Sequence, residues 1–237
     1  MRRTLDDARR WAAQGTGVLL ATAAGLDAGG YAAPSALPGW SRAHVAAHVA
    51  ANAGALSNLV RWAATGEPTP MYASPEERAA GIERGRTLPA AELTAWLHRS
   101  AEALEAAMAA LGEERWAAEV VTAQGRTVPA AEVPWMRSRE VWVHAVDLAN
   151  GTSFADLPPG FLTALCDDAA AKRAASPGPA VTLRAPAAGA SWELPGDGEP
   201  AVVTGELHDI AAYLTGRDAG PLTAAGGAPA PALGAWL

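Results

Sequence analysis

The chain has 237 residues, of which 50% are hydrophobic and 18% are charged, and its formal net charge is −7. This composition is typical of a globular protein with one large domain or two modest ones, and it excludes an intrinsically disordered chain. No basic stripe interrupts the acidic balance, so nucleic acid is not expected as a partner. No apolar run reaches the roughly 18 residues that a membrane span needs.

The start of the chain and its single cysteine indicate where the protein works. Arg2 and Arg3 are followed by polar residues, without the apolar stretch and cleavage site of a signal peptide. Cys166 has no second cysteine with which to form an internal disulfide, which fits a reducing compartment. We therefore expect a cytoplasmic protein in which Cys166 is a small buried hydrophobe on a helix and not a reactive thiol.

The first 150 residues carry helical patterns separated by segments rich in glycine and proline. Four helices with long connections predict a bundle, and bundle cores are a usual place for metal sites. The predicted helices are 5–24, with Gly15 and Gly17 as weak points; 42–64, capped by Ser41; 89–111, starting at Pro89; and a fourth from Pro129 or Pro134 to Asn150, closed by Gly151. The predicted connections are a loop over 25–39, a loop over 68–88 that can include a helix around Glu76–Arg84, and an irregular segment or short hairpin over 113–128.

The pattern changes after Gly151, where short β-like runs appear between glycines and prolines. Helices are expected over 158–175 and 206–216. The predicted strands are 181–184, 191–194 and 201–204, and 221–225 has the composition of a further strand. We therefore predict an α+β protein, with a four-helix bundle over 1–152, a small α/β domain over 153–237, and a boundary near 151–156.

The predicted fourth helix carries polar side chains in apolar surroundings. Glu140 and His144 are four residues apart, so they share one face of the helix. A carboxylate and an imidazole buried on such a helix are costly unless something pairs with them, and a divalent metal suits both. Asp147 falls on nearly the same side as Glu140, where it could accept a hydrogen bond from the ring of a metal-bound histidine.

The predicted second helix offers a complementary ligand. With about 100° per residue, His48 and Asn52 lie within about 60° of the inward direction that Val45 marks, whereas His44 lies about 100° away. His48 is therefore the better ligand, and Asn52 also faces inward. His44, at the flank, is expected at most to support the ligands from a second layer.

Two histidines and one carboxylate, with a fourth position open, are the ligands of a catalytic zinc ion. The arrangement differs from the His-Glu-x-x-His motif of zinc proteases, because no glutamate adjoins either histidine of the second helix. A second interpretation stays open on pattern alone, because such pairs arise by chance in alanine-rich helices and can be ordinary polar residues. His98 and His208 fit surface or capping roles.

Two stretches resemble the metal-site motifs of a known family. Residues 39–52 read Gly-Trp-Ser-Arg-Ala-His-Val-Ala-Ala-His-Val-Ala-Ala-Asn, and residues 134–147 read Pro-Trp-Met-Arg-Ser-Arg-Glu-Val-Trp-Val-His-Ala-Val-Asp. Both are similar to motifs of the mycothiol-dependent maleylpyruvate isomerase family, a branch of the DinB-like metal-binding four-helix proteins. The spacing of 92 residues between His48 and Glu140 is also similar. The C-terminal part resembles the family through residues 206–217, which end in Leu-Thr-Gly-Arg.

The resemblance implies a DinB-like bundle with a small C-terminal α/β domain, and it implies the site residues. The implied zinc ligands are His48, Glu140 and His144, and the implied active-site arginine is Arg217. Mycothiol is the implied thiol cosubstrate, and Asn52 is expected to contact substrate or thiol. The implied substrate is an unsaturated dicarboxylic keto acid, maleylpyruvate, which reversible addition of a thiolate would convert to fumarylpyruvate. Arg217 would hold a carboxylate, reaching across the domain interface.

Two other functions stay open at this point. A mycothiol S-transferase would use the same zinc and thiol site but keep the adduct, for detoxification or biosynthesis. A non-enzymatic module would bind a hydrophobic ligand in the α/β domain, with the metal only stabilising the bundle. The open coordination position favours the two enzymes over the module, and nothing in the sequence separates the isomerase from the transferase.

Overall fold

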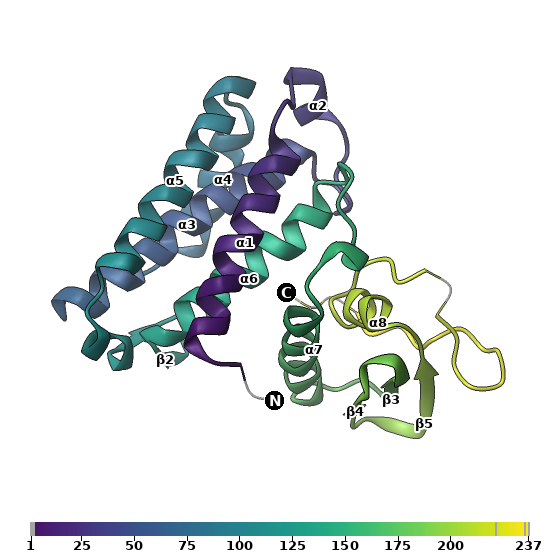
Figure 1. Ribbon diagram of the computed structural model, residues 1–237. Helices are drawn as coiled ribbons and strands as arrows, with labels where there is room; N and C mark the ends of the chain where they lie inside the picture. The colour runs from purple at the N-terminus through teal and green to yellow at the C-terminus, as the bar shows by residue number, and fades with distance from the viewer. Residues whose placement is uncertain (1–2, 221, 235, 237) are drawn as a thin grey trace. The chain divides into compact units, whose positions relative to one another are not determined.

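The computed structural model describes residues 3–220, 222–234 and 236 (Figure 1). The chain divides into two compact units, one over Arg3–Thr152 and one from Ser153 onward. The first is helical and the second contains a small sheet, which confirms the predicted α+β class. Within the described residues, no helix combines the length and the apolar content needed to cross a lipid bilayer.

Four long helices form the first unit and confirm the predicted bundle. They are α1 (Leu5–Ala23), α3 (Arg42–Thr65), α5 (Ala90–Ala110) and α6 (Val133–Asp147). Helix α1 packs along α6, and α3 packs along α5 and also contacts α6 (Figure 1). Much of the core lies where α3 and α5 meet, with fully buried Leu56, Leu59 and Leu104. Helix α3 is therefore the central element of this unit, and it carries its ligand candidate on the side that meets α6.

Gly15 marks the close crossing of α1 and α6. A Cβ atom at this position would lie 2.7 Å from Cγ2 of Val141 and 2.8 Å from the indole of Trp142. The Trp142 Nε1 group also donates a hydrogen bond to the carbonyl of Trp11, at 2.9 Å. Helix α1 continues through Gly15 and Gly17, and packing against α6 requires a residue without a side chain at position 15. Gly17 has open space around it.

The connections of the first unit contain more structure than the sequence predicted. Residues 25–39 include the short helix α2 (Ala28–Ala32), whose first turn is capped by Asp27 through a 2.7 Å bond from the Gly30 N–H. Residues 68–88 include α4 (Pro75–Arg86), which extends beyond the predicted 76–84 and packs on α3. Strands β1 (Glu119–Val121) and β2 (Thr127–Pro129) form an antiparallel hairpin, one of the two predicted alternatives.

Helix α6 ends at Asp147, three residues earlier than predicted, and Leu148 is its C-cap. Ala149 takes a positive φ of 49°, and Gly151, with φ 96°, lies beyond the helix. Arg42 at the start of α3 donates from Nε to the carbonyl of Leu148 at 2.7 Å and from Nη2 to that of Ala149 at 2.6 Å. These bonds satisfy carbonyl groups that a helix end leaves unpaired, so the helix stops without Gly151 as its cap.

The second unit packs two helices with a three-stranded sheet. Its elements are α7 (Pro159–Ala174), β3 (Pro179–Ala185), β4 (Ala190–Leu194), β5 (Asp197–Thr204) and α8 (Leu207–Leu214). The strand order is β4-β3-β5, with β3 antiparallel to β4 and parallel to β5. Helix α7 packs on α8 and β4, and Trp192 of β4 donates from Nε1 to Asp167 of α7 at 2.7 Å.

The further strand predicted over 221–225 is not formed as such in the described part of this segment. Thr223 and Ala224 make isolated bridges to Pro229 and Val203, respectively. Pro221 lies outside the described residues. The three other predicted strands are present, and each starts before its predicted first residue.

Candidate metal centre

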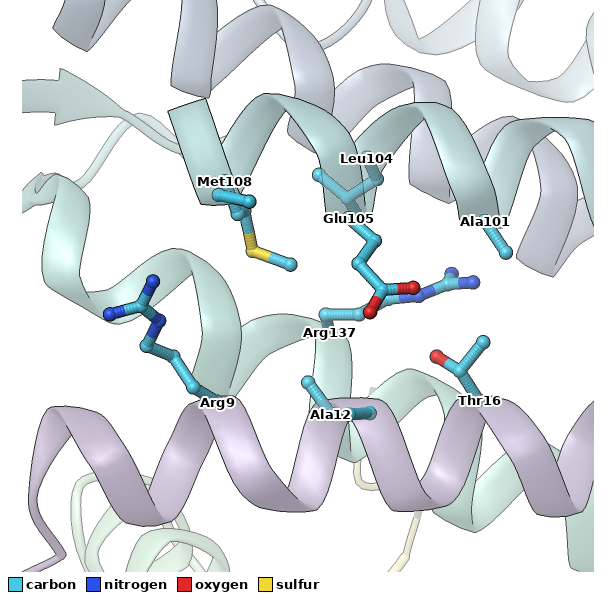
Figure 2. Close-up of a pocket in the computed structure, with 10 residues that line it drawn as sticks. Arg9, Ala12, Thr16, Ala101, Leu104, Glu105, Met108 and Arg137 are labelled. Atoms are coloured by element: carbon cyan, nitrogen blue, oxygen red, sulfur yellow. The ribbon is translucent and has the colours of Figure 1, made fainter. Parts of the chain in front are cut away.

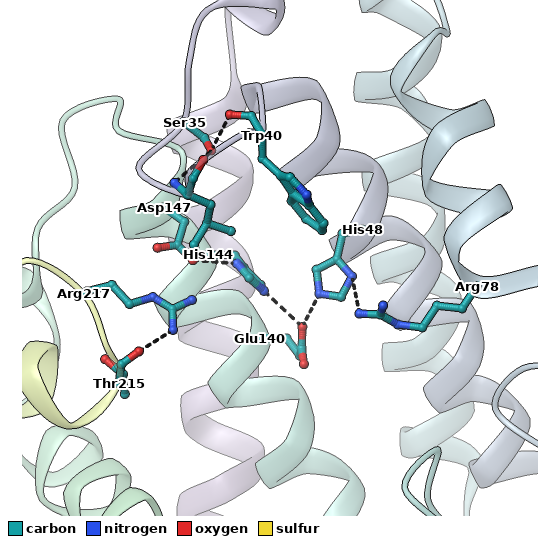
Figure 3. Close-up of polar contacts among 10 residues, drawn as sticks. Ser35, Trp40, His48, Arg78, Glu140, His144, Asp147, Thr215 and Arg217 are labelled. Carbon is teal, nitrogen blue, oxygen red and sulfur yellow. Dashed lines mark hydrogen bonds and ion pairs between the residues drawn. The ribbon is translucent and has the colours of Figure 1, made fainter. Parts of the chain in front are cut away.

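Helices α3 and α6 bring His48, Glu140 and His144 together inside the first unit (Figure 3). Nε2 of His48 is 2.9 Å from Oε2 of Glu140, and Nε2 of His144 is 3.4 Å from the same oxygen. The two imidazole rings lie 4.8 Å apart at an angle of 84°. One donor atom from each residue lies within 4.8 Å of the donor atoms of the other two.

This geometry fits a zinc ion. Nitrogen and oxygen ligands lie 2.0–2.2 Å from zinc, which puts two ligands of a tetrahedron about 3.4 Å apart. The separations of 2.9 and 3.4 Å between Glu140 and the two histidines are close to that value, and the histidine donor atoms lie within 4.8 Å of each other. Among the described residues the group holds three ligands, which is the number found in catalytic zinc sites with one position for water or substrate.

The charges of the cluster are coupled through Glu140. Burial would raise the pKa of the Glu140 carboxyl, but His48 and His144 outweigh burial and hold this pKa well below its usual value. Burial lowers the pKa of His48, and Glu140 opposes that shift. Burial also acts to lower the pKa of His144, but hydrogen bonds to Asp147 and Glu140 outweigh it and raise this pKa to about 9. An ionised carboxylate between two imidazoles is a donor set that a divalent cation stabilises.

Asp147 orients His144 from behind. Its side chain is fully buried, and its Oδ2 atom lies 2.8 Å from Nδ1 of His144 (Figure 3). This bond leaves Nε2 of His144 facing Glu140. A carboxylate on the outer nitrogen of a ligand histidine fixes the ring and raises its basicity, which is the usual arrangement in zinc sites.

His44 lies at the start of α3 and not behind the cluster. Its Nδ1 accepts a hydrogen bond from the backbone N–H of Ser41 at 3.0 Å, and its Nε2 is 3.7 Å from Glu83. The indole of Trp40 lies 5.8 Å from the rings of both His44 and His48. The structure thus gives His44 a capping contact with Ser41, and its expected support of the ligands from a second layer stays a prediction.

The chain matches the family model of the mycothiol maleylpyruvate isomerase N-terminal domain over residues 12–149, a range that contains all three residues of the cluster. The chain belongs to the mycothiol maleylpyruvate isomerase family. Two solved structures are 38% identical to it, with a TM-score of 0.91 and coverage of 97% of this chain and 96% of theirs. They are crystal structures of the mycothiol-dependent maleylpyruvate isomerase and of a histidine-to-alanine mutant of it. These relatives are enzymes, and so is this member of the family. Among curated protein sequences there is no match to the chain.

Membership of the mycothiol maleylpyruvate isomerase family confirms the resemblance found in the sequence, but it does not point to every residue at the site. Arg78 of α4 places Nη2 3.4 Å from Nδ1 of His48 (Figure 3), and its guanidinium lies 5.9 Å from the centre of the Tyr72 ring. Asn52 is buried, interacts with Tyr72, and leaves its side-chain oxygen without a partner among the described residues. Tyr72, Arg78 and Asn52 therefore add polar groups beside the cluster.

Tyr72 and Arg78 were not among the predicted site residues, although the helix expected around 76–84 contains Arg78. The start of this helix carries a clear signal. Ser74 is the N-cap residue and accepts a 3.2 Å bond from the N–H of Glu77, and Pro75 occupies the first turn. The sequence Ser-Pro-Glu-Glu is typical of a helix start and places the first residue of α4 at Pro75, one residue before the expected start.

The two other residues considered for a chemical role, Arg217 and Cys166, lie in the second unit. Arg217 donates from Nη1 to the carbonyl of Thr215 at 2.7 Å, and its guanidinium lies 5.8 Å from the ring centre of Trp236. Cys166 is fully buried in α7, as predicted. Burial, together with the charge of Asp167, raises the pKa of its thiol far above the ordinary value, which makes it a poor nucleophile.

Proposed function

We propose that this enzyme is a zinc- and mycothiol-dependent cis–trans isomerase that converts maleylpyruvate, or a close analogue, to fumarylpyruvate. The observation that carries the proposal is the cluster of His48, Glu140 and His144, whose donor atoms lie within 4.8 Å of one another. The chain that contains this cluster is 38% identical to the mycothiol-dependent maleylpyruvate isomerase, and 97% of the chain is covered by the comparison.

The proposed division of work in the first unit follows from the contacts of each side chain. His48, Glu140 and His144 would hold the zinc ion, and Asp147 would keep the ring of His144 in place. A zinc ion in this site would lower the pKa of a thiol in its open position, so that a thiolate is available at neutral pH. Cys166 does not provide that thiol, because it is fully buried and its pKa is raised. Mycothiol, from solution, would provide it.

The proposed reaction leaves the thiol unchanged at the end. The sulfur of mycothiol forms a bond to one carbon of the cis double bond, and the displaced electron pair moves to the conjugated carbonyl oxygen. The former double bond is now single and rotates. When the electron pair returns, the double bond forms again as trans and the carbon–sulfur bond breaks. Negative charge develops on the carbonyl oxygen between these events, and a nearby cation stabilises it most.

In the helical unit, Arg78 is a cationic side chain beside the cluster that would bind an anionic substrate. A guanidinium only donates, so its 3.4 Å contact with Nδ1 of His48 requires that nitrogen to be unprotonated. A neutral histidine that binds a metal through Nε2 carries its proton on Nδ1, and the two donors would then face each other. We infer that metal binding ends this contact and leaves the guanidinium to bind a substrate carboxylate through two parallel hydrogen bonds. Tyr72 and Asn52 would add single hydrogen bonds.

Arg217 is proposed as a second residue that binds a carboxylate of the substrate, because its segment resembles the family motif. Its bidentate donor geometry suits a carboxylate of the substrate.

The experiment that tests the function is an assay of the zinc-loaded enzyme with mycothiol and maleylpyruvate. We expect the maleylpyruvate absorbance to fall while the concentration of free thiol stays constant. The Cys166→Ser variant should behave like the wild type, because the thiol comes from solution. Consumption of one thiol per electrophile, with maleylpyruvate, a chlorinated aromatic or a bimane, would indicate an S-transferase in place of the isomerase. Turnover without any added thiol would contradict both.

A further inference from the structure

A cavity of about 170 Å³ lies between α1 and α5 in the first unit (Figure 2). None of the three cluster residues lines it. Residues of α1 form one wall and residues of α5 the opposite wall, and the side chain of Arg137 enters from α6 behind them. The lining residues are Arg9, Ala12, Ala13, Thr16, Ala101, Leu104, Glu105, Met108, Ala109 and Arg137.

Arg137 is an unusual residue to line a cavity of this kind. Its side chain is only 2% exposed. Nη1 donates to the carbonyl of Val49 at 3.0 Å, but the buried Nη2 has no hydrogen-bond partner among the described residues. Burial lowers the pKa of Arg137 to about 10, with Glu140 opposing the shift, so the guanidinium is still charged at neutral pH. A buried charge without a counterion is unfavourable, so an anionic acceptor placed near this guanidinium would offset part of its cost.

The nearby acidic side chains do not provide that acceptor. Glu105 is exposed at the edge of the cavity, and no ion pair joins it to Arg137 in the described chain. Glu140 lies one turn along α6, but its Oε2 is engaged with His48 at 2.9 Å. The second cation at the edge, Arg9, packs over the ring of Trp116 at 5.3 Å and lies 4.0 Å from Glu113. The positively charged guanidinium of Arg137, deep in the cavity, therefore has no paired anion among these groups.

The rest of the lining is mainly apolar and small. Four alanines, with Leu104 and Met108, form most of the walls. Thr16, which is half-buried, adds one hydroxyl group that faces the cavity. A lining of this kind suits the apolar body of a ligand whose anionic end lies at Arg137.

We propose that this cavity is a binding site for a small carboxylic acid with one carboxylate and a compact apolar body. The carboxylate lies near the guanidinium of Arg137, which attracts it by its charge, and accepts a hydrogen bond from the hydroxyl of Thr16, and the apolar body packs against the alanines and Leu104. An apolar cavity of about 150 Å³ in another protein holds one benzene molecule. The cavity here therefore has room for an acid of the size of benzoate or butyrate and not for a long-chain fatty acid.

A purely structural role for Arg137 explains only part of what is observed. The bond to Val49 uses Nη1 and links α6 to α3. It does not account for the unsatisfied Nη2, nor for alanines at positions where larger side chains would fill the space. The inference does not depend on the proposed isomerase activity, because none of the residues assigned to that activity lines the cavity.

The test measures binding to the whole protein by calorimetry and by the shift in melting temperature. Benzoate and butyrate are the ligands, benzyl alcohol is the neutral probe with the same body, and inorganic phosphate is the anion without one. We expect saturable binding of the two carboxylates and a rise in melting temperature with ligand concentration. The alcohol and phosphate should bind at least about 10-fold more weakly, because each lacks one of the two interactions.

Three variants locate the site. Ala101→Leu fills the cavity and keeps the guanidinium, and Arg137→Met removes the charge while keeping an apolar stem; each should weaken carboxylate binding at least about 10-fold. Ala103→Leu, on the same helix but exposed and outside the lining, should bind like the wild type. If Arg137→Met does not fold, Ala101→Leu decides alone. Absence of saturable binding by the wild type, or unchanged binding by Ala101→Leu, overturns the proposal.

Discussion

His44 and His48 lie one turn apart on α3, yet their rings have different partners. Nδ1 of His44 binds the backbone of Ser41, so its ring is already used to start the helix. Nε2 of His48 lies against Glu140. The position of each ring on the helix therefore decides which histidine is available to a metal, and helix phase is a property that the sequence alone provides.

The first prediction concerns metal content. His48→Ala and His144→Ala should each lose zinc, measured by elemental analysis of the purified protein, because a two-ligand site binds it far more weakly. His44→Ala is the matched control and should keep its zinc. It should also lower the melting temperature slightly, because the cap at Ser41 is lost.

Full zinc occupancy in both His48→Ala and His144→Ala would rule out this ligand set. Loss of zinc from His44→Ala, to the extent seen for His48→Ala, would mean that the wrong histidine of α3 has been assigned.

The second prediction concerns Arg78. Arg78→Ala should lower kcat/KM for the anionic substrate by about 10²-fold, a typical loss for a positioned charge, and leave zinc content unchanged. Arg78→Lys should recover only part, because a lysine lacks the two parallel donors. Arg84, on the same helix, is 65% exposed and pairs with Glu77 at 2.6 Å, so Arg84→Ala is the control and should act like the wild type. Equal steady-state kinetics for Arg78→Ala and Arg84→Ala would remove Arg78 from the site.

At the scale of elements, α6 depends on two contacts of different kinds. Along its length it packs against α1 at Gly15, where a Cβ atom would lie 2.7 Å from Val141. At its end it receives the hydrogen bonds of Arg42 from α3. Because Glu140 and His144 both lie on this helix, its placement sets the position of two of the three candidate ligands.

The third prediction compares the two glycines of α1. Gly15→Ala should destabilise the protein by about 1–3 kcal/mol, because the added methyl overpacks the crossing with α6. Gly17→Ala should stabilise it by about 0.5–1 kcal/mol, because that position has open space and alanine is the better helix former. Unfolding in urea measures both. A Gly15→Ala variant as stable as Gly17→Ala would show that the crossing can relax.

The helices were predictable from sequence because their apolar positions repeat with the helical period and their ends carry caps such as Ser41. The grouping of two candidate ligands was predictable because spacing of four along a helix places Glu140 and His144 on one face. Arg78 could not be placed in this way, since its proximity to His48 depends on how α4 packs on α3. The early end of α6 was missed for a related reason, because it depends on Arg42, more than a hundred residues away in the chain.

At the scale of the whole molecule, the chain comprises a helical unit that holds the cluster and a smaller unit that holds Arg217. The helical unit alone matches the family model, whereas the likeness to the solved enzymes extends over 97% of the chain. Substitution of Arg217 therefore tests whether the second unit takes part in the reaction.

The fourth prediction is that Arg217→Ala keeps zinc and the melting temperature but lowers turnover at least about 10²-fold. Arg217→Lys should restore only part of the rate. Arg184→Ala removes an exposed cation from β3 of the same unit and should leave the rate unchanged. Wild-type turnover by Arg217→Ala, with zinc bound, would mean that the second unit contributes something other than this side chain to the enzyme.

The fifth prediction concerns removal of the metal. After chelation the helical circular dichroism should be unchanged and the melting temperature only lowered, because the core around Leu56, Leu59 and Leu104 forms without the ligands. Loss of the helical signal on chelation would instead place this protein with those whose folding requires the metal.

The hydrogen bonds from Arg42 to the end of α6 have a consequence for how a metal ion would enter the proposed site. They tie the first turn of one ligand-bearing helix to the last turn of the other, so the two backbones are held in register before any ion arrives. Such a preorganised site loses little conformational entropy on binding, and more of the intrinsic affinity of its ligands is retained. The Arg42→Ala variant would remove these hydrogen bonds but keep all three candidate ligands. A bound metal ion should then exchange with solution faster than in the wild type.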